Sequence, residues 1–301
     1  MTFQSTTKFG ALLLVLILTG CGDDSRRSSG SSNAGTTAPI NQHHKVAAGS
    51  DHSVAVTAEG DVLVWGRSDP APEGLSDVVA VAAGRSHSLA MKADGTVVGW
   101  GYVDVPEDLD DVAGISAGSS FSVAVKTDGT VVAWGSAGDG ETDVPAGLSG
   151  VAAVSAGYLH TLALKTDGTV VSWGVNDTGQ GSIPEGLRNV VAVSAGDLHS
   201  LALKGDGTVV AWGRAHRNRT AVPEGLRDVV AIAAGDSHSI ALKRDGTVVA
   251  WGMNEDGQLD VPSDLTDAAA IAAGDHHNLA MRADGTIVCW GAGYDGQCDV
   301  P

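Results

Sequence analysis

The feature that most constrains this chain is a sequence repeat that occurs seven times. Every tryptophan is followed by glycine, and a glycine preceded by alanine stands sixteen residues before each tryptophan. Successive tryptophans are 35, 34, 39, 39, 39 and 39 residues apart. Repeats with a period near 40 residues are typical of solenoids and β-propellers. The repeated tryptophans are Trp65, Trp100, Trp134, Trp173, Trp212, Trp251 and Trp290.

Each repeat predicts short β-strands and no helix. Runs of Val, Ile, Leu and Ala alternate with turn residues, as in residues 229–235 and 238–243. An Asp-Gly pair between the second and third runs predicts a two-residue type I′ hairpin, because that turn needs positive φ at both central residues. The stretch around Pro262 leaves room for a fourth, outer strand, and four short strands fill such a repeat. The predicted fold class is all-β, a seven-bladed β-propeller.

The two ends of the chain predict that the ring closes by pairing of N- and C-terminal segments. The chain stops at Val300-Pro301, so the last repeat lacks its next segment. Ile40 and Val46 stand nine and three residues before Gly49, in the phase that the missing segment requires. An open solenoid would instead need polar capping repeats, and none is visible. We therefore expect the N-terminal segment to complete the last blade.

The repeat has a recognisable consensus. It reads Ala-Gly-x-x-His-Ser-Leu-Ala-Leu-Lys-x-Asp-Gly-Thr-Val-x-x-Trp-Gly, followed in several copies by Asn-x-x-Gly-Gln. Over residues 39–301 this pattern resembles the repeat of the regulator of chromosome condensation family, which implies a seven-bladed propeller. The short spacing with Val-Pro is similar to the bacterial branch of that family, which includes a propeller-type β-lactamase inhibitory protein. WD-type propellers match less well, because every tryptophan here is followed by glycine.

The first 20 residues predict an export signal that is not part of the fold. Lys8 precedes an apolar run at residues 9–18, which is shorter than the roughly 20 apolar residues that span a bilayer. Residues 18–21, Leu-Thr-Gly-Cys, resemble the cleavage box of bacterial lipoproteins, which implies acylation of Cys21. An ordinary signal peptide is the alternative. Residues 21–38 are rich in Ser, Gly and Thr and predict a flexible tether. We expect an exported, membrane-anchored lipoprotein of the bacterial cell envelope.

Charge and motif content argue against several classes of function. Lys and Arg number 18 against 36 Asp and Glu, a formal net charge of −18, so binding of nucleic acid through its phosphates is not expected. No phosphate-binding loop, serine elbow or paired-carboxylate motif stands out. We therefore expect no catalytic residue, no cofactor and no enzyme activity.

Six repeats have a histidine at one shared position, where the third repeat has Phe121. A ring of imidazoles could bind a metal, but no Cys or carboxylate recurs with them at ligand spacing. Because Phe occupies the same slot, we favour packed histidines bonded to backbone or hydroxyl groups, and we expect no metal site. The six are His52, His87, His160, His199, His238 and His277.

Two cysteines remain once Cys21 is assigned to lipid. Cys289 directly precedes Trp290, and Cys298 follows nine residues after Cys289 in the same repeat. Outside the cytoplasm nearby thiols tend to oxidise, so we expect a disulfide between them. A pair of buried free thiols is the alternative.

One sector of the repeat array departs from the rest. The fifth repeat replaces Asn-x-x-Gly-Gln by an arginine-rich loop, and nearby turns have the only large apolar residues at their positions. Tyr and Arg often supply interface energy, so we expect a protein partner with an acidic patch to dock there, with a solvated basic loop as the alternative. The predicted partner-binding residues are Tyr158, Leu159, Leu198, Arg214, His216, Arg217 and Arg219.

Together these expectations describe a non-enzymatic protein-binding scaffold, a monomer that contacts the membrane through its lipid anchor only. Two alternatives remain. One is a secreted-type enzyme inhibitor, which by the resemblance would bind through aromatic side chains on blade loops; among the turn positions only Tyr158 is aromatic. The other is guanine-nucleotide exchange activity, known in eukaryotic members of the family, which requires a cytoplasmic GTPase and does not fit an exported chain.

Overall fold

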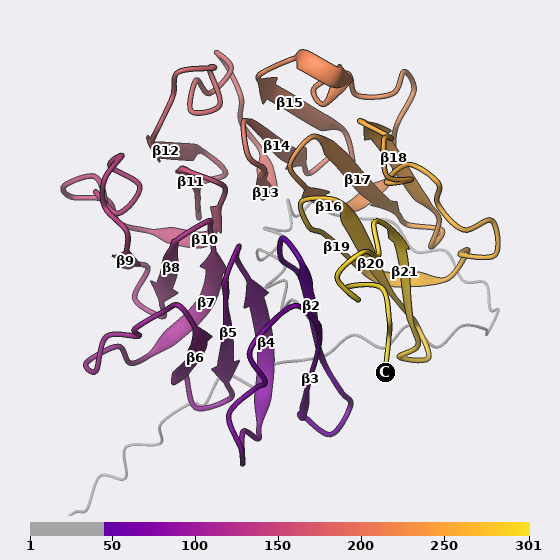
Figure 1. The fold of residues 1–301 in the computed structure, drawn as a ribbon. Helices are drawn as coiled ribbons and strands as arrows, with labels where there is room; N and C mark the ends of the chain where they lie inside the picture. Colours follow the sequence, from indigo (N-terminus) through magenta and orange to yellow (C-terminus); the bar gives the residue numbers. More distant parts are fainter. Residues whose placement is uncertain (1–44) are drawn as a thin grey trace, which may run out of the picture. The chain divides into compact units, whose positions relative to one another are not determined.

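The computed structural model describes residues 45–301, and the predicted signal peptide, Cys21, the tether and Ile40 lie outside the described residues. Residues 45–301 form seven antiparallel sheets arranged around a central axis (Figure 1). The predicted all-β, seven-bladed propeller is confirmed. Within this part of the chain no helix has the length and apolar character needed to cross a membrane.

The sheets, called blades one to seven below, follow one another in chain order. Blades one to four contain β1 (Val46–Ala48), β2 (His52–Val56), β3 (Val62–Gly66), β4 (Val78–Ala83), β5 (His87–Lys92), β6 (Val97–Gly101), β7 (Val112–Ala117), β8 (Phe121–Lys126), β9 (Val131–Gly135), β10 (Val151–Ala156), β11 (His160–Lys165) and β12 (Val170–Gly174). Blades five to seven contain β13 (Val190–Ala195), β14 (His199–Lys204), β15 (Val209–Gly213), the 3₁₀ turn η1 (His216–Asn218), β16 (Val229–Ala234), β17 (His238–Lys243), β18 (Val248–Gly252), β19 (Ala268–Ala273), β20 (His277–Arg282) and β21 (Ile287–Gly291).

Each blade has three strands, so the expectation of a fourth outer strand is wrong. The first strand of each blade lines the central channel, and the third lies outermost. The segment expected to form the fourth strand packs on the blade through its side chains instead. In blade two, for example, the side chains of Val103 and Val105 occupy the space beside Gly99 of β6 that a larger residue there would need.

The hairpin between the second and third strands also differs from the predicted type I′ turn. In blade three Gly129 N donates to Lys126 O (2.9 Å) and Lys126 N donates to Thr130 O (2.9 Å), which closes a three-residue loop. Gly129 has a φ of 81°, whereas Asp128 has no positive φ. The loop is therefore a type I turn followed by a glycine bulge. Asp128 is held in this form because its Oδ1 accepts from Thr130 N (2.9 Å) and Thr130 Oγ1 (2.7 Å).

The hydrophobic core lies between neighbouring blades. Leu201 of blade five packs in one cluster with Ile232 and Trp251 of blade six, and Leu201 is fully buried. The same kind of cluster joins Leu279 of blade seven to Trp65 of blade one. Each tryptophan therefore fills the gap between its own blade and the preceding one, which explains why it recurs in every repeat.

A ring of seven glycines surrounds the axis where the inner strands end. A Cβ atom on any of them would collide with the carbonyl oxygen of the next glycine in the ring. The contact runs from blade to blade and returns from Gly274 to Gly49. The glycine of every Ala-Gly pair is thus required by close approach of neighbouring backbones. The ring consists of Gly49, Gly84, Gly118, Gly157, Gly196, Gly235 and Gly274.

The two ends of the described chain meet through hydrogen bonds, and the expected strand pairing between them is not present in residues 45–301. β1 pairs with β2 inside blade one, and blade seven consists of β19–β21. Trp65 Nε1 and Ser53 Oγ of blade one both donate to Gln297 O, at 2.8 Å and 2.9 Å. The last junction therefore uses the same loop-to-blade bonds that join most of the other blades.

Candidate functional site

The turns between the first and second strands and the loops after each tryptophan lie on one face of the propeller, called the loop face below. Each loop begins with a hydrogen bond to the turn of its own blade. Arg214 N donates to Leu198 O (2.8 Å), and Tyr102 N donates to Ser86 O (3.1 Å). The turns and the loops therefore lie side by side on the same face.

The repeated histidines bridge neighbouring blades. Nε2 of His199 lies 2.9 Å from Ser239 Oγ on the next blade, and Ser239 Oγ donates its proton to Arg219 O (3.3 Å). Because that hydroxyl proton is already used, His199 must donate from Nε2. The same tautomer follows for His238, whose Nε2 lies 2.8 Å from the amide oxygen of Asn278.

Burial keeps these imidazoles neutral. It lowers the pKa from the usual 6.5 to about 4 at His52, His87, His160 and His238, and to about 3 at His199 and His277. Each Nε2 bonds to a hydroxyl or amide of the next blade, which fits packed histidines better than metal ligands. In residues 45–301 no group of three or more His, Cys, Asp and Glu could hold a metal ion.

Blade three interrupts this chain of histidine bonds. Phe121 is 1 % exposed and fills the histidine slot by packing. On blade four, Thr161 stands where the other blades have the serine or asparagine acceptor, and its buried Oγ1 has no hydrogen-bond partner in the described part of the chain. The junction between blades three and four therefore lacks one polar link that the other junctions have.

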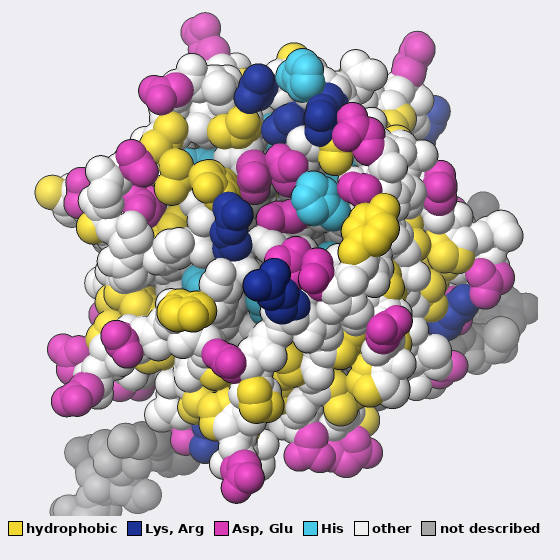
Figure 2. Space-filling model, viewed as in Figure 1, with side chains coloured by type: hydrophobic (Ala, Val, Ile, Leu, Met, Phe, Trp, Pro, Cys, Tyr) yellow, Lys and Arg dark blue, Asp and Glu magenta, His cyan; other side chains and the backbone are white. Residues whose placement is uncertain are grey.

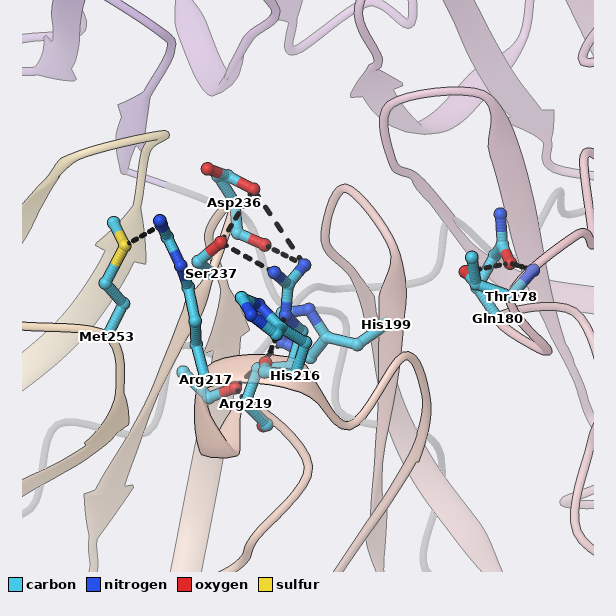
Figure 3. Close-up of polar contacts among 10 residues, drawn as sticks. Thr178, Gln180, His199, His216, Arg217, Arg219, Asp236, Ser237 and Met253 are labelled. Atoms are coloured by element: carbon cyan, nitrogen blue, oxygen red, sulfur yellow. Dashed lines mark hydrogen bonds and ion pairs between the residues drawn. The ribbon is translucent and has the colours of Figure 1, made fainter.

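A buried glutamine or glutamate braces most of the long loops. Gln180 of blade four is 1 % exposed, and its Oε1 accepts from Thr178 N (3.0 Å) and Thr178 Oγ1 (2.7 Å) (Figure 3). This brace presents Gln180 O to the next blade, where it accepts from Trp212 Nε1 (2.9 Å) and Ser200 Oγ (2.8 Å). Sequence reasoning noticed the repeated Gly-Gln but did not assign it this role. The matching residues in blades three, six and seven are Glu141, Gln258 and Gln297.

Arg219 takes the place of this glutamine in blade five. It is 3 % exposed, and its guanidinium donates to His216 O (3.1 Å), Asp236 O (3.1 Å) and Ser237 Oγ (2.8 Å) (Figure 3). Its carbonyl accepts from Trp251 Nε1 at 3.0 Å. Arg219 thus links its loop to blade six from a buried position, although it was expected among the partner-binding residues.

The other basic residues of the blade-five loop differ in their contacts with the rest of the propeller. Arg214 and His216 are exposed. Arg217 has a φ of 63°, and its guanidinium reaches blade six, where it contacts Met253 Sδ and lies 3.3 Å from a carboxylate oxygen of Glu255. The predicted basic sector therefore offers Arg214 and His216 to solvent, while Arg217 is partly engaged within the chain.

A central channel with a volume of about 180 Å³ runs between the seven inner strands, and its walls are mainly Ala, Val, Ile, Gly and Ser. Figure 2 shows acidic, basic and histidine side chains gathered in the middle of the face that it presents. Asp197 and Asp275 lie at the channel mouth. Burial and the nearby carboxylates of Asp275 and Asp236 raise the pKa of Asp197.

The predicted apolar members of the site do not gather on the basic loop. Arg85, across the channel mouth, donates to Tyr158 Oη (3.3 Å), and its guanidinium carbon lies 5.9 Å from the ring centre. The Tyr158 side chain is therefore linked to blade two, while Tyr158 N donates to Gly196 O of blade five (3.3 Å). Leu159 and Leu198 are half-buried in their turns.

All three tyrosines of the chain lie on the loop face. Tyr102 and Tyr294, in the loops of blades two and seven, are 89 % and 83 % exposed, and Tyr158 is half-buried. Sequence reasoning compared only the turn positions and so missed Tyr102 and Tyr294. The available signal was their place shortly after a Trp-Gly pair.

A disulfide joins Cys289 of β21 to Cys298 in the loop that follows, with the Cα atoms 5.3 Å apart. The neighbouring residue, Gln297, supplies the carbonyl that bonds blade one. The bridge therefore holds the residue that closes the ring.

The repeats themselves identify the family. The family description for the regulator of chromosome condensation (RCC1) repeat matches residues 44–69, 78–102, 112–141, 151–180, 190–218, 229–258 and 268–297. These seven matches coincide with the seven blades and together cover more than half of the chain. The chain belongs to the RCC1 repeat family.

Several solved structures share the fold of this RCC1-repeat protein. The ectodomain of the receptor kinase CR4 from Physcomitrella patens has a TM-score of 0.72 and 22 % identity, and the match covers 83 % of this chain and 74 % of that chain. Prp20p from Saccharomyces cerevisiae, studied with its binding to Gsp1p and histones, has a TM-score of 0.63 and 20 % identity over 76 % of this chain and 80 % of that one. Prp20 bound to Kap60 has a TM-score of 0.65 and 20 % identity over 92 % and 87 %. Comparison with curated protein sequences gives no match.

Proposed function

We propose that this RCC1-repeat propeller is a non-enzymatic protein-binding scaffold that acts as a monomer, displayed on the bacterial cell envelope through a lipid on Cys21. The observation that supports it best is the placement of every tyrosine on the loop face, with Tyr102 and Tyr294 almost fully exposed. Arg85 and Arg214 are exposed on the same face. Tyr and Arg are the residue types that most often supply the binding energy of protein interfaces.

A binding role fits the interior better than catalysis does. The six buried histidines are bonded to the next blade and neutral, so they have no free role as acid or base. The channel walls are mainly small apolar residues. Yeast Prp20p, which shares the fold, binds Gsp1p and histones. Exchange activity on a GTPase is a weaker proposal for this chain, because the expected export signal would place it outside the cytoplasm.

A secreted-type enzyme inhibitor, as in the bacterial branch of the family, is the second candidate. The exposed Tyr102 and Tyr294 favour it, because they supply loop aromatics that the turns lack. An inhibition assay with β-lactamases at micromolar concentrations of the propeller tests this candidate directly. Unchanged hydrolysis with every class of β-lactamase would remove it.

Two experiments test the main proposal. Cys21→Ala should release the protein from membranes, and retention of the variant on membranes would refute the lipid anchor. For binding, the soluble propeller is used to capture proteins from an envelope extract. The captured protein is then purified and its affinity measured.

The binding test compares two triple variants of exposed residues. The first changes Tyr102, Tyr294 and Arg214 on the loop face to serine. The control changes Leu63, Arg188 and Arg227, which lie away from that face, to serine. We expect the first to lose at least about tenfold in affinity, the equivalent of about 1.4 kcal/mol, and the control to keep it. Equal binding by both variants, or capture of no protein by the wild type, would refute the proposal.

A further inference from the structure

Blades one and two have shorter loops on the loop face than the other five. The proline that ends the loop follows the tryptophan by seven residues in blade one and by six in blade two, against eleven in the rest. The residue seven positions after the tryptophan, which supplies the bridging carbonyl in a long loop, therefore has no counterpart in these two.

The five long loops all use that carbonyl in the same way. In each case its oxygen accepts a hydrogen bond from the indole Nε1 of the next blade, over 2.8–3.0 Å. The donors are Trp65, Trp173, Trp212, Trp251 and Trp290.

The two tryptophans that follow the short loops have no acceptor. Nε1 of Trp100 and Nε1 of Trp134 are buried without a hydrogen-bond partner among residues 45–301. Their side chains are only 6 % and 8 % exposed, as deeply buried as the five that are bonded. A buried N–H without a partner is unfavourable, so both donors are suited to an acceptor that residues 45–301 do not supply.

The surroundings of these donors have the composition of a protein interface. Tyr102, in the short loop of blade two, is the most exposed large hydrophobic side chain of the described propeller, at 89 %. Arg85, in the turn of the same blade, is exposed and can pair with a carboxylate. Tyr158 contacts Arg85 from blade four.

We infer that the short loops of blades one and two, residues 67–71 and 102–105, form the docking site for a loop of the partner protein. This region is called the low sector below. The incoming loop places backbone carbonyls on Trp100 Nε1 and Trp134 Nε1, as the chain's own long loops do elsewhere, packs on Tyr102 and offers a carboxylate to Arg85. Because both Nε1 atoms are covered in the free chain, the short loops shift when the partner docks. This inference rests on the proposed protein-binding function.

The test grafts a long loop into the low sector. Residues 175–183 of blade four replace residues 67–71 of blade one and residues 102–105 of blade two, which restores the eleven-residue spacing. The matched control places the same nine residues over residues 253–261 of blade six, where the length is unchanged. Amide and indole NMR spectra of each variant report whether the seven indole N–H groups are hydrogen-bonded.

We expect the graft to shift the indole signals of Trp100 and Trp134 into the range of the other five, and to weaken binding of the captured protein by at least about tenfold. The control should leave both unchanged. Equal binding by graft and control would overturn the docking site while the proposed function stands. Capture of no protein by the wild type would overturn both.

Two further outcomes overturn the inference without touching the proposed function. One is a graft that leaves the Trp100 and Trp134 signals where they are. The other is a wild-type spectrum in which a buried water already gives both indoles the signature of a bonded donor. Should the graft fail to fold, Tyr102→Ser replaces it, with Arg227→Ser, away from the loop face, as its control. Loss of at least about tenfold in affinity is then expected for Tyr102→Ser alone, and an equal effect of the two would refute the site.

Discussion

Replacing single tryptophans by phenylalanine tests whether loop carbonyls hold the blades together. Trp212→Phe removes an N–H that donates to Gln180 O at 2.9 Å. Trp134→Phe removes an N–H that has no acceptor. The two side chains are 7 % and 8 % exposed, so the loss of buried ring area is nearly the same in both variants. The difference between them therefore isolates the hydrogen bond.

The size of that difference follows from hydrogen-bond energetics. A typical hydrogen bond contributes about 0.5–1.5 kcal/mol, and a buried N–H without a partner costs about 1–3 kcal/mol. Trp212→Phe should lower the free energy of unfolding by about 1.5–4.5 kcal/mol more than Trp134→Phe does. In a domain of this size about 1 kcal/mol corresponds to roughly 2–4 °C in Tm, so the two Tm values should differ by at least about 3 °C.

Urea unfolding followed by circular dichroism measures the two free energies, and thermal melts give the Tm values. Trp173→Phe and Trp100→Phe form a second matched pair, since Trp173 Nε1 donates to Glu141 O (2.9 Å) and Trp100 Nε1 has no acceptor. If both members of each pair lose the same stability, the loop carbonyls do not contribute to holding the blades. A greater loss at Trp100 and Trp134 would refute the assignment of unpaired donors.

His199→Phe should make the fold less sensitive to acid. Burial lowers the pKa of His199 to about 3 while the unfolded chain titrates near 6.5, so this residue alone lowers the stability by about 1.4 kcal/mol per pH unit as the pH drops from about 6.5 towards 3. Urea unfolding across this range should show a pH slope that is smaller by this amount in the variant, because the other five buried histidines still titrate. Gly157→Ala should unfold the propeller or lower its Tm strongly, because the new Cβ would collide with the next glycine's carbonyl. Gly205→Ala, where the nearest atom is 3.6 Å away, should change stability by less than about 1 kcal/mol in the same melts. Cys298→Ser should lower the free energy of unfolding by about 2 kcal/mol, the low end expected for a short disulfide loop. Equal stability of the wild type and the variant would argue against the bridge.

The blades and their number could be predicted because the same pattern recurs seven times. A single copy of residues 229–252 is ambiguous, but seven copies in one phase require seven equivalent units, and a ring satisfies them. The turn type was predicted wrongly because a side-chain hydrogen bond determines the local backbone conformation. Asp128 accepts two hydrogen bonds from Thr130, which favours a type I turn with a glycine bulge over the type I′ turn that Asp-Gly alone suggests.

The reason for the glycine that follows alanine in every repeat could not be read from the sequence. A glycine needed for its backbone conformation would have a positive φ, but Gly157 has none. A side chain is excluded at Gly157 by the carbonyl oxygen of the next blade. The fourth strand was overpredicted for a related reason. The Val-Pro segments have the composition of a strand, yet their side chains pack on the sheet, and backbone pairing depends on a tertiary position that composition does not specify.

The candidate site was predicted in outline but not residue by residue. Arg219 was grouped with Arg214 and Arg217 because all three lie in one arginine-rich loop. The register of the repeat already separated them: Arg219 stands seven residues after Trp212, as Gln180 stands seven after Trp173. That position is buried in every long loop, so an arginine there becomes a brace instead of a contact for a partner.

The seven junctions between blades are not equivalent, and the difference falls in one sector. Junctions from blade four round to blade one each have both polar links, the histidine bond and the indole-to-carbonyl bond. The first two junctions lack the indole bond, and the junction between blades three and four lacks the histidine bond at Phe121. Segments with fewer stabilising contacts open at lower free-energy cost. A partner's loop would therefore restore missing hydrogen bonds in the sector that opens at the lowest free-energy cost. Docking there would stabilise the least stable part of the ring.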